Sequence, residues 1–197
     1  MTDALAEVRA HFRAHFARAG IAAEPDAASV TFLGTEPIDV LRFGPDDDGV
    51  FHYASLGCSR YPMTDPAAMA VDPLRGPRAE VVVSLRGPSP AGLARAVAVL
   101  AAAPAVEGLV LEPDALIDLS TPLWDGAPFN AVLLCPSDIG DIALPAPHEA
   151  VAVLAAIPIT ATEAAWVRLK GADAMRKAWC SDDVDVLDPS RRASRPG

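Results

Sequence analysis

The sequence has little cysteine, and its three cysteines (Cys58, Cys135 and Cys180) lie far apart. They form neither a Cys-x-x-Cys pair nor the spacing of a zinc site. An odd number of separated cysteines does not build the disulfide framework of a small secreted domain. The pattern therefore predicts free thiols in a reducing compartment, and we expect a cytoplasmic protein.

Long apolar runs are also missing. A membrane-spanning helix needs roughly 18 to 20 apolar residues, whereas the longest candidate, Ala150–Ile159, has ten residues and contains Pro158. The opening residues, MTDALAEVRAHF, lack the apolar core of a signal peptide. The sequence thus predicts a soluble protein that does not bind a membrane.

Basic residues are absent between Arg95 and Arg168, and the formal net charge of the chain is −10. Nucleic acids are bound largely through Lys and Arg at phosphates, so they are disfavoured as partners. If the acidic residues share a face, their field would steer a basic protein. The alternative is a scattered acidic surface that keeps the chain in solution. This stretch carries nine acidic residues: Glu107, Glu112, Asp114, Asp118, Asp125, Asp138, Asp141, Glu149 and Glu163.

Motifs for catalysis are incomplete or absent. The sequence has neither of the Gly-rich phosphate loops, GxGxxG and GxxxxGK[ST]. Residues 57–61 (GCSRY) approach the Gly-x-Ser-x-Gly elbow of hydrolases, but Tyr61 stands where the second Gly is needed. Cys58 would be a nucleophile only beside a base such as His52 or His148. A cysteine-dependent enzyme is therefore the least favoured alternative.

Metal-binding patterns fail in the same way. His11 and His15 are four residues apart, but the Glu of a HExxH motif is missing. The run Asp46–Asp48 lacks the alternating ligands and distal Glu of a calcium loop. We therefore predict no catalytic residue, no metal ligand and no cofactor.

What the sequence does contain is enough apolar material for one core. Hydrophobic residues make up 51% of the 197 residues and charged residues 21%, which excludes a mainly disordered chain and fits one domain. Periodicity predicts helices over 3–19, 91–103 and 161–179, and strands over 30–33, 38–43, 50–55, 79–85, 109–111, 130–135 and 151–159.

This order mixes helices and strands without strict alternation. It predicts a single α/β domain of the α+β type, with helices packed on a mixed, largely antiparallel sheet. We expect an N-terminal amphipathic helix and connector over residues 1–29 and the main domain over residues 30–180. Residues 181–197 lose the apolar pattern, which is typical of a mobile tail.

One segment resembles a known family. Residues 53–63 (YASLGCSRYPM) resemble the signature region of the suppressor of fused domain family, with a strand, Gly-x-Ser and a following Pro-Met. Residues 78–85, residues 130–136 and the stretch from Ile157 to Ala174 are similar to later segments of that family, in the same order. The likeness spans roughly residues 30–178, and residues 116–129 depart from the family pattern.

The resemblance implies a mixed α/β domain with no established catalytic activity. The animal protein of that name restrains a transcription factor in Hedgehog signalling by clamping an extended peptide between two lobes. This chain has the length of one lobe, so that partner does not carry over. The composition is typical of a high-GC bacterium, and some bacterial relatives are suspected immunity proteins.

We therefore expect a non-enzymatic protein-binding domain with a basic partner. A bacterial immunity protein that occludes a basic toxin is the leading hypothesis. The alternatives are a regulatory scaffold that binds an extended peptide at a sheet edge and the cysteine-dependent enzyme. The sequence does not predict an oligomeric state. The candidate partner-binding residues are Ser59, Arg60, Met63, Glu112, Asp114, Asp118, Trp124 and Asp125.

Overall fold

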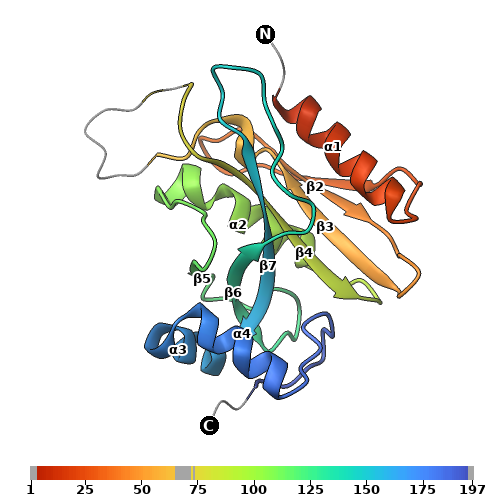
Figure 1. Cartoon of the computed structure of the whole chain (residues 1–197), viewed down its shortest axis with the longest axis vertical. Coiled ribbons are helices and arrows are strands. Elements are labelled where there is room, and N and C mark those ends of the chain that lie inside the picture. Colours follow the sequence, from red (N-terminus) through yellow and green to blue (C-terminus); the bar gives the residue numbers. More distant parts are fainter. Residues whose placement is uncertain (1–3, 65–71, 73, 195–197) are drawn as a thin grey trace.

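A seven-stranded mixed sheet forms the centre of the computed structural model, which describes residues 4–64, 72 and 74–194 (Figure 1). The strand order is β1-β2-β3-β4-β7-β6-β5, and every pair is antiparallel except β4 with β7. The strands are β1 (Asp26–Val30), β2 (Ile38–Phe43), β3 (Val50–Leu56), β4 (Arg78–Arg86), β5 (Leu116–Asp118), β6 (Phe129–Pro136) and β7 (Val151–Thr160). The helices are α1 (Ala4–Arg18), α2 (Leu93–Glu107), α3 (Ala161–Lys170) and α4 (Ala172–Ser181), with a 3-10 turn η1 (Cys58–Arg60).

The predicted fold class is confirmed, with differences at weakly patterned segments. The first strand begins at Asp26 rather than at residue 30, and four of its five residues are exposed, so it has no hydrophobic alternation to detect. The strand expected at 109–111 lies instead at 116–118. The helix expected over 161–179 is two helices, because Gly171 adopts φ 86° and ψ 167° and ends the first of them. In the part of the chain that the structure describes, no helix is long and apolar enough to cross a membrane.

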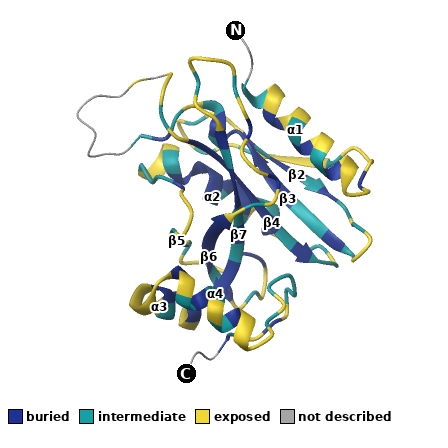
Figure 2. Ribbon diagram, in the orientation of Figure 1, coloured by how far each residue is buried: buried dark blue, intermediate teal, exposed yellow. Residues whose placement is uncertain are grey.

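Alternation along the strands divides the core between the two faces of the sheet. One face packs against α2 through residues such as Val40 and Val83. The opposite face packs against α1 at one end, where the Phe16 and Phe43 rings stack at 4.3 Å, and against α3 and α4 at the other end. Figure 2 shows that the central strands are buried on both sides. This arrangement leaves β1 and β5 as the two edges of the sheet.

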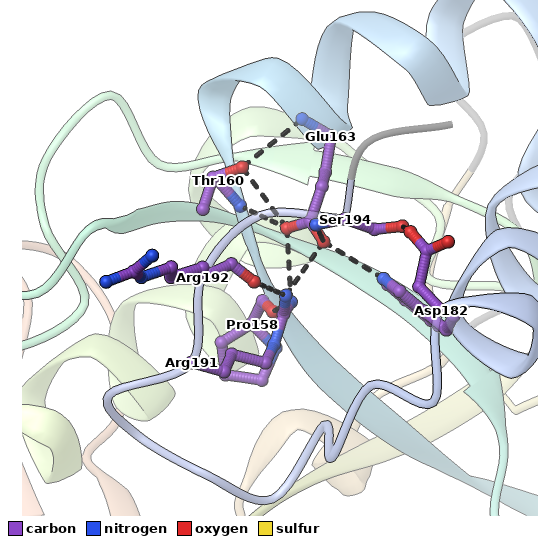
Figure 3. Close-up of polar contacts among 8 residues, drawn as sticks. Pro158, Thr160, Glu163, Asp182, Arg191, Arg192 and Ser194 are labelled. Atoms are coloured by element: carbon purple, nitrogen blue, oxygen red, sulfur yellow. Dashed lines mark hydrogen bonds and ion pairs between the residues drawn. The ribbon is translucent and has the colours of Figure 1, made fainter. Parts of the chain in front are cut away.

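The segment from residue 182 to residue 194, called the C-terminal segment below, contacts the domain through polar groups that include Arg191 and Ser194 (Figure 3). The guanidinium of Arg191 donates to both carboxylate oxygens of Glu163 at 2.7 and 3.1 Å. Glu163 is fully buried and Arg191 is 7% exposed. The mobility expected for this stretch stays a prediction. The sequence did not indicate its packing, because its main anchors are polar, although Val184 and Val186 also pack against the core. Residues 195–197 lie outside the described residues.

Glu163 also makes the stability of the chain sensitive to acid. Burial alone would raise the pKa of its carboxyl, but hydrogen bonds from Arg191, Thr160 and Trp179 outweigh burial and hold that pKa below its ordinary value of 4.5. A carboxyl with a lowered pKa in the folded state stabilises the fold above its ordinary pKa. That stabilisation is lost as the pH falls through the lowered value.

We expect Glu163→Gln to lower the free energy of unfolding at pH 7 by about 3 kcal/mol, because it leaves a buried guanidinium without its counter-ion. Below pH 4.5 the difference from the wild type should shrink. Urea unfolding between pH 7 and pH 3 measures both effects, with the exposed Glu112→Gln as control. A difference that stays constant over this range would contradict the assignment.

Candidate functional site

A buried carboxylate on the central strand β4 organises the loop that follows β3. Glu80 is fully buried. Its Oε1 accepts hydrogen bonds from the backbone N–H groups of Gly57 and Ser59 at 2.9 and 3.0 Å, and from the Ser59 hydroxyl at 2.6 Å. Its Oε2 accepts from the Ser55 hydroxyl, which in turn accepts from the N–H of Val81. A carboxylate in the core must be satisfied in this way, because an unpaired buried charge costs several kcal/mol.

Two further contacts hold the same loop in place. The guanidinium of Arg78 donates to the carbonyls of Ser59 and Arg60 at 2.7 and 2.8 Å. Gly57 has φ 144°, and a Cβ there would lie 3.0 to 3.3 Å from Pro37 and Ile38, so only glycine fits this turn. The sequence GCSRYPM therefore forms a rigid turn rather than a reactive one.

The fixed loop forms one wall of a groove of about 710 Å³. Arg60, Tyr61 and Met63 contribute from the loop. The opposite walls are the β1–β2 connection and the C-terminal end of α2. Met63 is buried, and its sulfur accepts from the N–H of Leu111 at 3.2 Å.

A second pocket, of about 320 Å³, lies at the N-terminal end of α2 and borders β1. Ala27 and Ala28 of β1, Val40 of β2 and Tyr53 of β3 are among its lining residues. The Tyr53 hydroxyl is buried and lies beside the guanidinium of Arg42. The two pockets therefore lie at opposite ends of the seam between α2 and the β1–β2 hairpin. This seam is the candidate functional site.

The structure brings together only some of the residues that the sequence singled out. Arg60 and Met63 line the groove, and Ser59 is buried beneath it on Glu80. Arg60 also forms an ion pair with Glu36 at 2.6 Å.

The other candidates lie elsewhere. Trp124 is buried and its ring packs 5.4 Å from that of Phe129. With Asp125, Trp124 borders a pocket at the N-terminal end of α2. Glu112 is exposed and follows Leu111, which contacts Met63.

The acidic residues do not form one free surface. Asp114 is paired with Arg176 at 2.6 Å. Asp118 is paired with Arg168 at 2.8 Å. Glu163 is buried. The arginines that pair with Asp114 and Asp118 lie on α3 and α4. Both are outside the stretch between Arg95 and Arg168 that has no Lys or Arg.

Cys58 is placed poorly for nucleophilic catalysis. Burial, and then the charge of Glu80, raise the pKa of its thiol well above the ordinary 9.0, so the thiol is protonated at neutral pH. His52 instead contacts Ser84 and Asp46, and His148 contacts Arg78 and Leu74. Within the described residues, no group of three or more His, Cys, Asp or Glu side chains could hold a metal ion.

Sequence reasoning missed Glu80, Arg78, Tyr53 and the edge strand β1. A Glu within the apolar run RAEVVVSL was a usable signal, because a charge in a strand buried on both faces needs a dedicated set of donors. Tyr53 and β1 offered no such signal, because their role depends on how α2 packs against the sheet.

We expect Glu80→Gln to lower the free energy of unfolding by about 3 kcal/mol, because its amide NH₂ would face groups that are themselves donors. Glu112→Gln, at an exposed position, should change it by less than about 0.5 kcal/mol. Chemical unfolding of both variants measures the difference. Equal stabilities would show that Glu80 does not hold the loop.

Comparison with known proteins gives a consistent result. A family model described as Suppressor of fused protein (SUFU) matches residues 34–192. The chain is 16% identical to a SUFU homolog from Neisseria gonorrhoeae FA 1090, with a TM-score of 0.66, and the match covers 98% of this chain and 97% of that chain. No curated protein sequence matches the chain.

Two further solved structures have the same fold. A chain of the Sufu–Fu complex is 15% identical, with a TM-score of 0.67, and the match covers 96% of this chain and 91% of that one. Drosophila Suppressor of Fused is 14% identical, with a TM-score of 0.68, and 98% of this chain matches 51% of it. The family match includes the Glu80-bound loop, the strands that follow it and Arg191. The chain belongs to the suppressor of fused (SUFU) family.

Proposed function

We propose that this chain is a non-enzymatic protein-binding domain that takes up an extended segment of a partner along the edge strand β1. The observation that carries this proposal is an exposed edge that runs beside the candidate site. Within the described residues, β1 pairs only with β2, and four of its five side chains are exposed. An edge strand presents unpaired backbone N–H and C=O groups, which a partner strand can satisfy.

The other edge of the sheet is less suited to this role. Strand β5 has three residues, and Asp118 at its end is paired with Arg168 of α3. By contrast, the side chains of Ala27 and Ala28 in β1 are small, so a partner backbone can approach closely. The pocket beside them offers space for a partner side chain, and the Tyr53 hydroxyl, which lies beside the Arg42 guanidinium, would donate to it.

Exposed apolar side chains surround the other end of the seam. Of the five large exposed hydrophobic residues in the described part of the chain, Tyr61 lines the groove, and Leu33 and Val106 are next in sequence to residues that line it. Leu33 precedes Gly34, Tyr61 lines the groove, and Val106 follows Ala105 at the end of α2. Apolar side chains gathered around a groove are typical of protein-interaction sites.

A relative supports a protein partner, since one chain with this fold comes from the Sufu–Fu complex. That complex shows binding by the relative. For the present chain, the identity of the partner is part of the proposal. The regulatory scaffold is thus favoured over a cysteine-dependent enzyme, because His52 and His148 make their contacts with other residues and burial raises the pKa of the Cys58 thiol.

The matched variants Ala27→Pro and Ala28→Pro test strand addition. Successive N–H groups point to opposite edges of a strand, so one variant removes a β1–β2 hydrogen bond and the other an outward-facing donor. Peptides selected from a random library on the wild-type chain are the probe. We expect the variant that keeps wild-type stability to lose at least about tenfold in affinity, the cost of one net hydrogen bond. Unchanged affinity in the stable variant would contradict strand addition.

The groove is tested by Val106→Ser, with Leu169→Ser as its control. Both residues are exposed on helices, but Leu169 lies on α3, away from the groove. Loss of an apolar contact of this size should weaken binding of the selected peptides by about tenfold for Val106→Ser. Leu169→Ser should bind like the wild type. Equal effects of the two substitutions would show that the groove is not part of the binding surface.

The finer proposal, an immunity protein that occludes a basic toxin, is supported by the net charge of −10. Electrostatic attraction of this kind raises the association rate and weakens with salt. The peptide selection distinguishes the two proposals. Basic peptides whose affinity falls steeply with salt would support occlusion of a basic partner, whereas uncharged peptides insensitive to salt would support the scaffold alone.

A further inference from the structure

The guanidinium of Arg191 lies in a site built from β6, β7, α3 and α4, and Figure 3 shows its contacts to Pro158 and Glu163. Both of its Nη atoms donate to the carboxylate of Glu163 on α3, and Nη2 also donates to the carbonyl of Pro158 on β7 at 2.7 Å. Its central carbon lies 4.9 Å from the ring centroid of Phe129 on β6 and 5.8 Å from that of Trp179 on α4. A forked contact to a carboxylate combined with aromatic rings is the arrangement that distinguishes a guanidinium from an ammonium.

Contacts within the domain also position the residues of this site. The Glu163 carboxylate accepts from the Thr160 N–H at 2.9 Å and from the Trp179 indole N–H at 3.0 Å. Thr160 and Glu163 also form the capping box that starts α3. The rings of Phe129 and Trp179 are buried in the core. The carboxylate and the aromatic rings are therefore positioned by contacts among residues of the sheet and helices.

The C-terminal segment, in contrast, contacts the domain much as a bound peptide would. It contains no helix or strand. Besides Arg191, its contacts include a backbone hydrogen bond from the N–H of Arg86 to the carbonyl of Leu187 and an exposed ion pair between Arg86 and Asp185. Ser194 donates from its N–H to Glu163 and from its hydroxyl to Asp182. A small set of polar anchors thus fixes the segment to the domain.

The C-terminal segment carries its own charges beside the site. Asp182, Asp183, Asp185 and Asp188 line a hollow of about 650 Å³, together with Arg191 and Arg192. Because these groups belong to the segment that would be released, the preference for a cation comes from the buried Glu163 carboxylate, and the fork and rings favour arginine over lysine.

We propose that Phe129, Pro158, Glu163 and Trp179 form a guanidinium-binding site that Arg191 occupies as a tethered ligand and that an arginine side chain from another protein can occupy in its place. This site is independent of the proposed peptide site, because its residues come from β6, β7, α3 and α4, at the end of the sheet away from β1. An arginine bound in this way would release the C-terminal segment and uncover Arg86 at the end of β4.

Because Arg191 is part of the same chain, an external arginine must bind tightly to replace it. A ligand on a short linker competes at an effective concentration in the millimolar range. A single small guanidinium compound is therefore not expected to displace Arg191 from the wild-type chain. A partner would do so through additional contacts to the surface that the C-terminal segment covers.

The full-length Arg191→Ala variant tests the site directly, with methylguanidinium as the probe. The variant should unfold at a lower temperature than the wild type, and millimolar methylguanidinium should raise its midpoint again. Methylammonium at equal concentration and ionic strength should bind at least about tenfold more weakly, since it lacks the planar fork. Arg192→Ala is the matched control, and its midpoint should respond equally to the two compounds.

An equal response of Arg191→Ala to the two compounds would overturn the proposal. If that variant does not fold, Arg191→Lys keeps the positive charge and should show the same preference for methylguanidinium. A peptide of residues 184–194 added to Arg191→Ala provides a second measurement by calorimetry. It should bind, and the same peptide with Ala in place of Arg191 should bind at least about tenfold more weakly. Binding of the two peptides with equal affinity would also overturn the proposal.

Discussion

The buried carboxylate of Glu80 is the constraint on which the candidate site depends. It lies in a strand that is packed on both faces. Its negative charge is stabilised there by hydrogen bonds from neutral donors of Ser55, Gly57 and Ser59. The loop after β3 must close over this carboxylate, since opening would leave the charge without partners in the core. One wall of the groove is therefore fixed from the centre of the sheet, and a partner meets a surface that is already formed.

A second buried carboxylate, Glu163, also needs partners for its charge, and it obtains them in a different way. It uses a cation from a distant part of the sequence in addition to neutral donors. Glu80 is satisfied within two neighbouring strands and their loop, so it organises local structure. Glu163 depends on a residue 28 positions later, so it links the end of the described chain to the domain. Glu80 and Glu163 thus explain why the loop after β3 and the C-terminal segment each hold a defined position on the domain.

The fold could be predicted from the sequence where hydrophobic patterning was strong. Apolar runs in β4, β6 and β7, and the stripe of Val8, Phe12 and Phe16 in α1, indicated their elements. Strand β1 could not be found, because its side chains face solvent and its pairing is specified by β2. The loop with Arg60 and Met63 was found through its resemblance to a family. The pairing of Asp114 and Asp118 could not be predicted, because Arg168 and Arg176 reach them only after α3 and α4 have packed on the sheet.

The parallel pairing of β4 with β7 has a consequence for how the chain is made. Strands β1 to β4 form a meander of sequence neighbours, and β5 to β7 form a second antiparallel unit. In the sheet, the two units pair through β4 and β7, which are separated in sequence by α2 and two other strands. During synthesis, the edge of β4 that pairs with β7 therefore has no partner strand until most of the sequence has been synthesised. Long-range pairing of this kind slows folding and exposes nascent chains to aggregation. The pairing of β4 with β7 is therefore the folding step at which a chaperone would be of most use to this chain.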